Sequence, residues 1–387
     1  MNKGKIEELL KELEIRRQSY NNEKARELYW SSDKGVLYIS SEDINKTKTL
    51  LYSIYYEKYA TKITIKTFCK IIMECIIEKI KNKKIEDYLP KEVEFKVYKE
   101  FHGIEVEKKA EFGDFVIYNL KDEEIKKNLI KGKENFYFLE KQNNYVLETK
   151  ILSCEGEAAL INADKKNENF INFLYFITKN TPNCWFSSKR DLIEYSGGIA
   201  YSEKNWCEKF MDTPKTIIDL DKVHYECIKK QSTLSKICEI CTLKPKNKLE
   251  DAIKMAINWC GESIKEINLA SSLLKVVIAL EVLLSYNEGP VTPSILSQIS
   301  EATALIIGSD YQERLDIEKN LKRIYSNRSA ITHSGNESKA SILDRNYMLE
   351  VVAQVIGALL TKGYSKCENK EDVIDKLKKK KYSSCCN

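Results

Sequence analysis

Hydrophobic positions recur with two different periods along the 387 residues, and the change of period predicts a mixed first part and a helical second part. Apolar residues at helical spacing predict helices within 5–28 and 45–81. Val93, Phe95 and Val97 alternate with charged residues, which predicts a strand that continues at 104–106 after a turn. Short apolar runs predict further strands at Phe115–Tyr118, Phe136–Leu139, Tyr145–Leu147 and Ala158–Ile161 and a helix at 165–178, whereas 181–222 is rich in loops.

The second part, residues 249–362, keeps a helical period. Residues 273–284 are apolar on almost every side, which predicts a buried central helix. The pattern predicts further helices at 249–267, between Pro293 and Gly308, around 315–325 and over 343–359. We therefore expect the whole of this part to be helical.

A polar stretch at 242–248, which contains Pro245, marks the boundary between the two parts. We expect an α+β domain over 1–240 with a sensing or regulatory role and an all-α helical domain over 245–365. The lysine-rich residues 366–387 predict a basic, disordered tail.

Composition excludes several classes of protein. A hydrophobic content of 43% with 31% charged residues excludes a disordered chain and a multi-span membrane protein. The first 17 residues are charged and lack the apolar core of a secretory signal. We expect a cytoplasmic protein with no membrane partner, whose 12 cysteines are reduced.

The net charge of +5 is too small for a general nucleic-acid coat. Arginine is nevertheless concentrated in the helical part, at Arg314, Arg323, Arg328 and Arg345. One arginine side chain can bind two phosphate oxygens at once, so these residues could form a phosphate-binding surface. The alternative is that they lie on a solvated helix face.

The segment 325–333 contains the residues best suited to chemistry, because Arg328 and His333 are both rare types in this chain. On one ideal helix, five residues of separation place two side chains about 140° apart and about 7.5 Å along the axis. A helix break at Ser334-Gly335 would help to turn both toward one cleft. The simpler interpretation is a histidine bonded to the backbone at a helix end and an arginine on a solvated face.

Such a pair suits the cleavage of RNA without a metal ion or other cofactor. The 2′-hydroxyl must lose a proton to attack its own phosphodiester, the leaving 5′-oxygen must gain one, and a histidine can perform either transfer. An arginine stays charged and stabilises the negative charge that builds on the phosphate. One motif supplies one base, so we expect a symmetric homodimer with the cleft at its interface.

Four segments between residues 249 and 362 occur in a specific order: Ala279–Leu284, Glu301–Gly308, Tyr325–Ser329 and Ile331–His333. In these segments the chain resembles the HEPN superfamily (higher eukaryotes and prokaryotes nucleotide-binding) and, within it, the Apea-like HEPN family. The resemblance implies an all-α antiparallel HEPN-type helical bundle that dimerises. It also implies a metal-independent endoribonuclease at the dimer cleft with Arg328 and His333 as catalytic residues. Many such proteins resemble bacterial antiphage or toxin ribonucleases.

The chain departs from the family at two positions. Ser334 stands where the family usually has glycine after the histidine, and Gly335 stands where some toxins carry a tyrosine for adenylylation. That control mechanism is therefore not expected.

Residues near the motif are candidates for supporting roles or for RNA binding: Asn327, Ser329, Arg323, Tyr325 and Glu281. Glu281 lies in an otherwise apolar helix, and a buried carboxylate is costly unless it is paired. It would orient Arg328 or Arg323, or pair with a lysine.

A second candidate site has the ligand types of a zinc site. His224 and Cys227 precede Cys238 and Cys241 in an HxxC…CxxC array, which could hold a tetrahedral zinc ion. The same segment has a helical pattern, and cysteines three apart in a reduced chain are often buried apolar residues.

The main hypothesis is an endoribonuclease effector of antiphage defence or a toxin that acts on tRNA or mRNA. A phage-derived trigger or regulatory partner would bind the N-terminal domain. The alternatives are a non-catalytic module that dimerises or binds nucleotide or RNA, and a zinc-stapled sensor.

Overall fold

The computed structural model describes residues 13–15, 30–32, 35–39, 52–77, 89–131, 145–181, 184–188, 196–201, 206–211, 216–229, 232–286, 295–361 and 363–383. Two compact units divide the chain, namely residues 1–97 with 150–165, and residues 98–149 with 166–387. Three elements continue from one unit into the other: β4 (Val93–Phe101), β8 (Tyr145–Ser153) and α6 (Gly156–Ile177).

The smaller unit contains a three-stranded antiparallel sheet of order β1-β3-β2, with β1 at Leu13–Ile15, β2 at Trp30–Ser32 and β3 at Gly35–Ile39. Residues 52–58 and α3 (Ile65–Ile77) are helical, which agrees with the helical pattern within 45–81. The predicted helix within 5–28 lies largely outside the described residues, and its described part, β1, is a strand.

Residue Glu155 secures the start of α3. Its carboxylate accepts hydrogen bonds from the backbone N–H of Thr64 and from the hydroxyl of Thr67, at 2.6 Å for the latter. The bond from Thr64 satisfies a backbone donor that the start of a helix leaves without a partner inside the helix, and the bond from Thr67 holds the carboxylate in place.

A second sheet has four strands in the order β4-β8-β7-β6. Strand β7 (Phe115–Asn119) runs antiparallel to both of its neighbours, β6 (Lys109–Phe112) and β8. The strands predicted at 93–97, 115–118 and 145–147 are confirmed. Within the larger unit, the rings of Phe115 and Phe170 stack with their centroids 4.4 Å apart, which packs α6 against this sheet.

The prediction of a strand at Ala158–Ile161 is wrong, because these residues belong to α6. A run of four apolar residues is too short to reveal a period, and alanine favours a helix. The burial follows the helix: Ala158 and Ala159 are buried, whereas Leu160 and Ile161 are exposed. The strand predicted at Phe136–Leu139 lies outside the described residues.

Several short elements lie between the sheet strands or between the sheet and the helical region. They are β5 (Ile104–Glu105), α4 (Glu123–Ile130), the hairpin of β9 (Ser196–Tyr201) and β10 (Trp206–Met211), β11 (Ile218–Asp219), which pairs in parallel with β5, α7 (Leu220–Ile228) and α8 (Thr233–Thr242).

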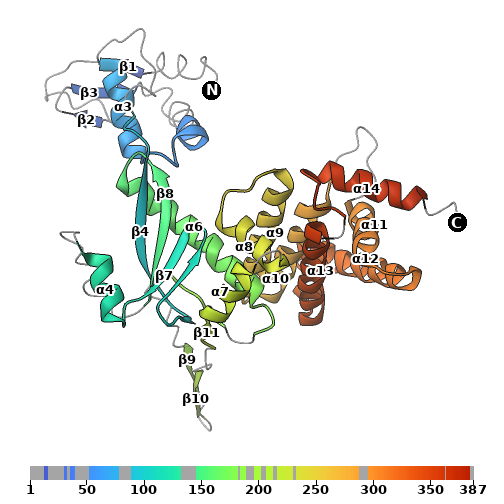
Figure 1. Cartoon of the computed structure of the whole chain (residues 1–387). Coiled ribbons are helices and arrows are strands. Elements are labelled where there is room, and N and C mark those ends of the chain that lie inside the picture. The colour runs from blue at the N-terminus through green and yellow to red at the C-terminus, as the bar shows by residue number, and fades with distance from the viewer. Residues whose placement is uncertain are drawn as a thin grey trace. The chain divides into compact units, whose positions relative to one another are not determined.

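The described residues after 247 are mainly helical, as the sequence pattern predicts (Figure 1). The elements are α9 (Lys248–Lys265), α10 (Leu269–Leu284), α11 (Ile295–Ile307), α12 (Tyr311–Ser334), a short 3-10 helix η2 (Glu337–Lys339), α13 (Ile342–Thr361) and α14 (Lys370–Ser383). Helix α10 contacts α9, α11, α12 and α13, and nine of its side chains are buried, so the predicted central helix is confirmed.

The architecture is therefore broadly α+β with a helical region. One hydrophobic core extends from Phe101 in β4 to Leu377 in α14. The predicted boundary at 242–248 coincides with the loop between α8 and α9, and residues on both sides of that loop contribute to the core.

The expected disordered tail is instead helical over Lys370–Ser383. Its apolar side chains Val373, Ile374 and Leu377 are buried, and α14 contacts α11. The high lysine content concealed this narrow apolar stripe, because lysines occupy the remaining faces of the helix.

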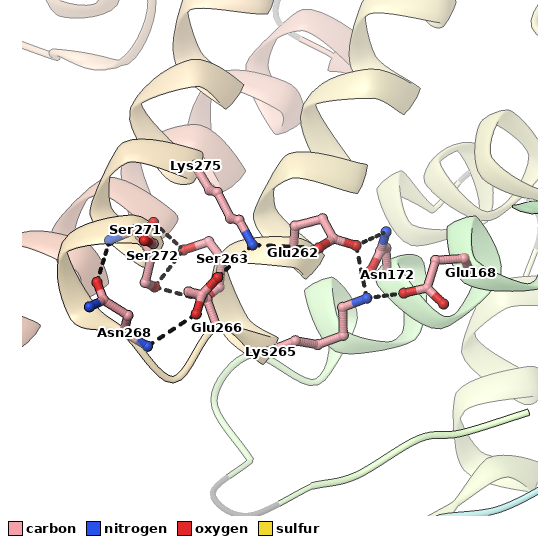
Figure 2. Close-up of polar contacts among 10 residues, drawn as sticks. All are labelled: Glu168, Asn172, Glu262, Ser263, Lys265, Glu266, Asn268, Ser271, Ser272 and Lys275. Carbon is pink, nitrogen blue, oxygen red and sulfur yellow. Dashed lines mark hydrogen bonds and ion pairs between the residues drawn. The ribbon is translucent and has the colours of Figure 1, made fainter. Parts of the chain in front are cut away.

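A polar network joins α6 to α9 and α10 inside the larger unit (Figure 2). Glu262 accepts hydrogen bonds from Asn172 of α6 (3.1 Å) and from Lys265 (2.8 Å), and Lys265 also binds Glu168. Lys275 of α10 reaches Glu266 (2.8 Å), and the hydroxyl of Ser263 donates to the carbonyl of Ser272 (2.8 Å). The three helices thus share charged partners as well as apolar contacts.

Among the described residues, none of the helices combines the length and the apolar character that crossing a bilayer requires.

Candidate functional site

Helix α12 positions most of the predicted site residues. Asp310 caps its start by accepting a hydrogen bond from the backbone of Glu313 (2.9 Å), and Gly335 follows its end with a φ of 62°. That left-handed conformation favours glycine, and the N–H of Gly335 bonds back to Ile331. The predicted helix end at Ser334-Gly335 is confirmed, but it follows His333, so the helix is continuous from Arg328 to His333.

Residue Arg328 reaches across to α10. Its Nη2 atom lies 3.8 Å from Oε1 of Glu281, and both side chains are partly buried, with 33% and 22% of their surface exposed. The sequence left open Arg328, Arg323 or a lysine as the partner of Glu281, and Arg328 is the one in contact. The remaining charged residue of α10, Lys275, pairs with Glu266 and Glu262.

Burial and the arginine act in opposite directions on Glu281. Burial raises the pKa of the Glu281 carboxyl because it disfavours the charged form, while the positive charge of Arg328 lowers it, and burial has the larger effect. Burial therefore makes the charged form of Glu281 costly, and Arg328 offsets part of that cost; perturbed carboxyl groups of this kind are common at functional sites.

Tyr325 completes the inner part of this cluster. Its ring is buried, its hydroxyl has no hydrogen-bond partner among the described residues, and burial raises its pKa, with a further contribution from Glu281. A buried hydroxyl without a partner is costly to the fold, so this position is an unusual one for a tyrosine.

On the other side of α12, Arg323 and Asn327 bind a residue that the sequence analysis did not select. The guanidinium of Arg323 donates two hydrogen bonds to Asp344 of α13, at 2.9 and 2.6 Å, and Asn327 donates a third at 3.2 Å. Asp344 is buried. Arg323 and Asn327 therefore join α12 to α13 through Asp344.

The sequence contained only a weak signal for Asp344. It is an acidic residue in the first turn of a predicted helix, which is usually explained by the helix dipole alone. Its arginine partner lies 21 positions earlier, and no local pattern connects them.

The remaining predicted residues lie on the surface. His333 and Ser329 are exposed, and the His333 side chain makes no hydrogen bond or ion pair among the described residues. Arg328 and His333 are not in contact within one chain, in keeping with a separation of about 140° on a continuous helix.

The other arginines of the helical region bind protein groups or are partly buried. Arg314 donates to the carbonyl of Gly308 at 3.2 Å. The Nε atom of Arg345 is buried without a hydrogen-bond partner among the described residues, and burial lowers the pKa of this side chain. The four arginines therefore do not form one open phosphate-binding surface.

The zinc alternative is not supported by the geometry. Cys227, Cys238 and Cys241 are buried near one another, but His224 packs the edge of its ring against Phe112, with centroids 5.3 Å apart. Over the described ranges, no three histidine, cysteine or acidic side chains are arranged to hold a metal ion. The helical interpretation of the segment is confirmed by α7 and α8.

Comparison with known proteins gives no relative: no family model, no curated protein and no solved structure matches this chain.

Proposed function

We propose that the chain is a metal-independent endoribonuclease of the HEPN type, in which Arg328 and His333 act on the RNA backbone. The observation that carries this proposal is the partly buried pair of Arg328 and Glu281 beside the buried hydroxyl of Tyr325. A polar cluster of this kind in an apolar bundle is expensive to maintain, and a catalytic role accounts for that cost.

Each residue has a role that follows from its chemistry. The 2′-hydroxyl of the RNA attacks the adjacent phosphorus, and His333, which is exposed to solvent, accepts its proton or protonates the leaving 5′-oxygen. The guanidinium of Arg328 binds the phosphate as its negative charge increases. The products are a 2′,3′-cyclic phosphate and a 5′-hydroxyl.

A second copy of the chain is required, because Arg328 and His333 of one copy lie apart on α12. Exposed apolar side chains support such an interface: Leu343 and Ile342 begin α13, and Ile267 precedes α10. The hydrogen bond between Asn268 and Glu337 (3.4 Å) joins the turn before α10 to the segment that follows His333. Exposed apolar groups near a reactive residue are typical of a partner surface.

The resemblance to the HEPN superfamily also suggests the substrate and the role of the protein in the cell. The substrate is tRNA or mRNA in the cytoplasm, the effect is growth arrest in antiphage defence or as a toxin, and the N-terminal residues bind a phage-derived or regulatory partner. A non-catalytic dimerisation or RNA-binding module is the competing function.

The test compares wild type with Arg328→Ala and His333→Ala on total RNA in EDTA and in cells that express each protein. The matched control is Lys319→Ala, which removes an exposed cation from the same helix. We expect cleavage and growth arrest by wild type and the control, and a loss of about 100-fold or more in the two site variants. Equal behaviour of wild type and His333→Ala favours the non-catalytic module.

A further inference from the structure

Helix α14 lies beside α11 (Figure 1), and a cavity of about 230 Å³, named here the α11–α14 cavity, is open between them. Buried Ile374 and Leu377 fix α14 in place, and the Nζ atom of Lys380 donates to the carbonyl of Leu305 at 2.7 Å. The walls of the cavity are therefore set by contacts of the fold. None of the residues that line it belongs to the site proposed above.

Two aromatic rings line the α11–α14 cavity. Tyr286 follows the end of α10, is partly buried and packs against the core. Tyr382 lies in the last turn of α14 and is 69% exposed. A flat aromatic face on a hydrated surface is a platform on which a nucleic-acid base stacks, and such stacking tolerates any sequence.

Two lysines line the same cavity. The Nζ atom of Lys378 lies 6.0 Å from the centre of the Tyr286 ring, and that of Lys381 lies 5.9 Å from the centre of the Tyr382 ring. Lys381 also pairs with Glu301, which is the carboxylate among the lining residues. Lys381 therefore offsets the charge of Glu301, and Lys378 leaves the cavity positive beside an aromatic ring.

A polar side chain brings hydrogen-bonding atoms to the cavity. Gln298 of α11 lines it and is only 5% exposed. Its amide group contains both donors and an acceptor, which are the kinds of atom that the edge of a base presents. The cavity thus combines rings for stacking, a cation and a polar amide.

The size of the cavity limits what it holds. Its volume of about 230 Å³ is below the range of about 300–1,000 Å³ that is usual for sites enclosing a whole drug-sized ligand, so it suits one ring system with the rest of the molecule outside.

A second cavity has the opposite charge. It has about 500 Å³, lies between α12 and α13, and is lined by the carboxylates of Asp310, Glu313, Asp316 and Glu350. These charges would repel a phosphate group, so of the two cavities the α11–α14 cavity is the one suited to a nucleotide.

We propose that the α11–α14 cavity binds one nucleotide unit of single-stranded RNA. The base stacks on Tyr286 or Tyr382, Lys378 binds the phosphate, and the strand continues outside the cavity. The choice of RNA over a free nucleotide rests on the proposed function and on the small volume of the cavity. The site would hold the RNA on the protein without taking part in its cleavage.

The experiment uses the full chain as His333→Ala, so that RNA is bound without being cut, and a short single-stranded RNA that contains 4-thiouridine. Near-ultraviolet light joins this base to the protein, and mass spectrometry identifies the joined peptides. We expect these peptides to contain Tyr286 or Tyr382. In fluorescence anisotropy, Tyr382→Ala should weaken RNA binding about 10-fold, and its high exposure makes this variant harmless to the fold.

The phosphate contact is tested by Lys378→Ala. Loss of one such contact should reduce the dependence of log Kd on log salt concentration by about 0.7. The matched control is Lys379→Ala, which removes the neighbouring exposed charge of α14 but does not alter the lining of the cavity. An equal effect of both variants would show attraction by net charge alone and would overturn the proposal.

Two further results would overturn it. The first is that the RNA is joined only to peptides without Tyr286 and Tyr382. The second is that AMP, titrated alone, binds in a manner that depends on Tyr382 while RNA does not, because the site would then belong to a free nucleotide. Cleavage by wild type is measured separately, so binding without cleavage contradicts only the nuclease proposal, and cleavage without these crosslinks contradicts only this one.

Discussion

Arg328 on α12 lies with its Nη2 atom 3.8 Å from Oε1 of Glu281 on α10, and both side chains are partly buried where the two helices meet. Burial of Glu281 disfavours its charge more strongly than the arginine favours it, so ionisation of Glu281 is less favourable in the folded protein than in the unfolded chain. Its effect on stability and its effect on activity should therefore differ in sign.

The carboxyl of Glu281 makes the free energy of unfolding depend on pH. Because the folded-state pKa of Glu281 is raised, the folded protein binds this proton more tightly than the unfolded chain. The contribution of Glu281 to stability is therefore present below its ordinary pKa of 4.5 and is lost as the pH rises through the raised value. Urea unfolding of wild type and Glu281→Gln between pH 4.5 and 8 should show wild type losing stability relative to the variant, and parallel curves would contradict this.

The effect on activity follows from the position of Arg328. Without the carboxylate, the guanidinium is free to leave the orientation that the proposed reaction requires, and a misplacement of this kind costs about 10- to 100-fold in rate. In Glu281→Gln we expect RNA cleavage to fall by about that factor while RNA binding changes little. Single-turnover cleavage and filter binding measure the two separately, and equal losses in both would refute a positioning role.

Arg323 should act on stability and not on the reaction, although the sequence placed it among the RNA-binding candidates. Arg323→Ala leaves the buried carboxylate of Asp344 with the single donor Asn327, at a cost of about 2 kcal/mol. Arg323→Lys should lose less, since one charged bond can remain. Denaturant unfolding tests this, and an unchanged stability with abolished cleavage would return Arg323 to the RNA site.

The crossing of α6 and α9 depends on Gly261. A Cβ atom at this position would lie 2.4 Å from the backbone Cα of Asn172, so Gly261→Ala forces the helices apart and should cost about 1–3 kcal/mol. A Cβ atom added at Gly357 in α13 would meet no atom within 4 Å beyond its own helix backbone. Gly357→Ala should therefore be neutral or stabilising by up to about 1 kcal/mol. If the two variants unfold at the same denaturant concentration, the close approach of α9 to α6 at Gly261 is disproved.

The pattern of the sequence predicts the helices well because each helix repeats its signal over several turns. The central helix and the end of α12 at Gly335 are of this kind. The run Ala158–Ile161 is too short to carry a period, and the stripe of Val373, Ile374 and Leu377 is narrow and surrounded by lysines, so both were misjudged.

The candidate site is predictable only in part. That Glu281 needs a cation follows from one acidic residue on an apolar helix, but the choice between Arg328 and Arg323 depends on how α12 is rotated against α10. Asp344 was missed because its contacts cross between helices. The zinc site was not predictable for a similar reason, because spacing along the chain does not determine the direction of the His224 side chain.

The most direct test of the central claim is the chemistry of the cut RNA ends in the presence of EDTA. The account predicts that wild type produces fragments ending in 2′,3′-cyclic phosphate, that RNA with 2′-O-methyl groups is not cut, and that His333→Ala produces no fragments. Fragments ending in a 3′-hydroxyl, cleavage of the 2′-O-methyl RNA, or undiminished cleavage by His333→Ala would contradict it.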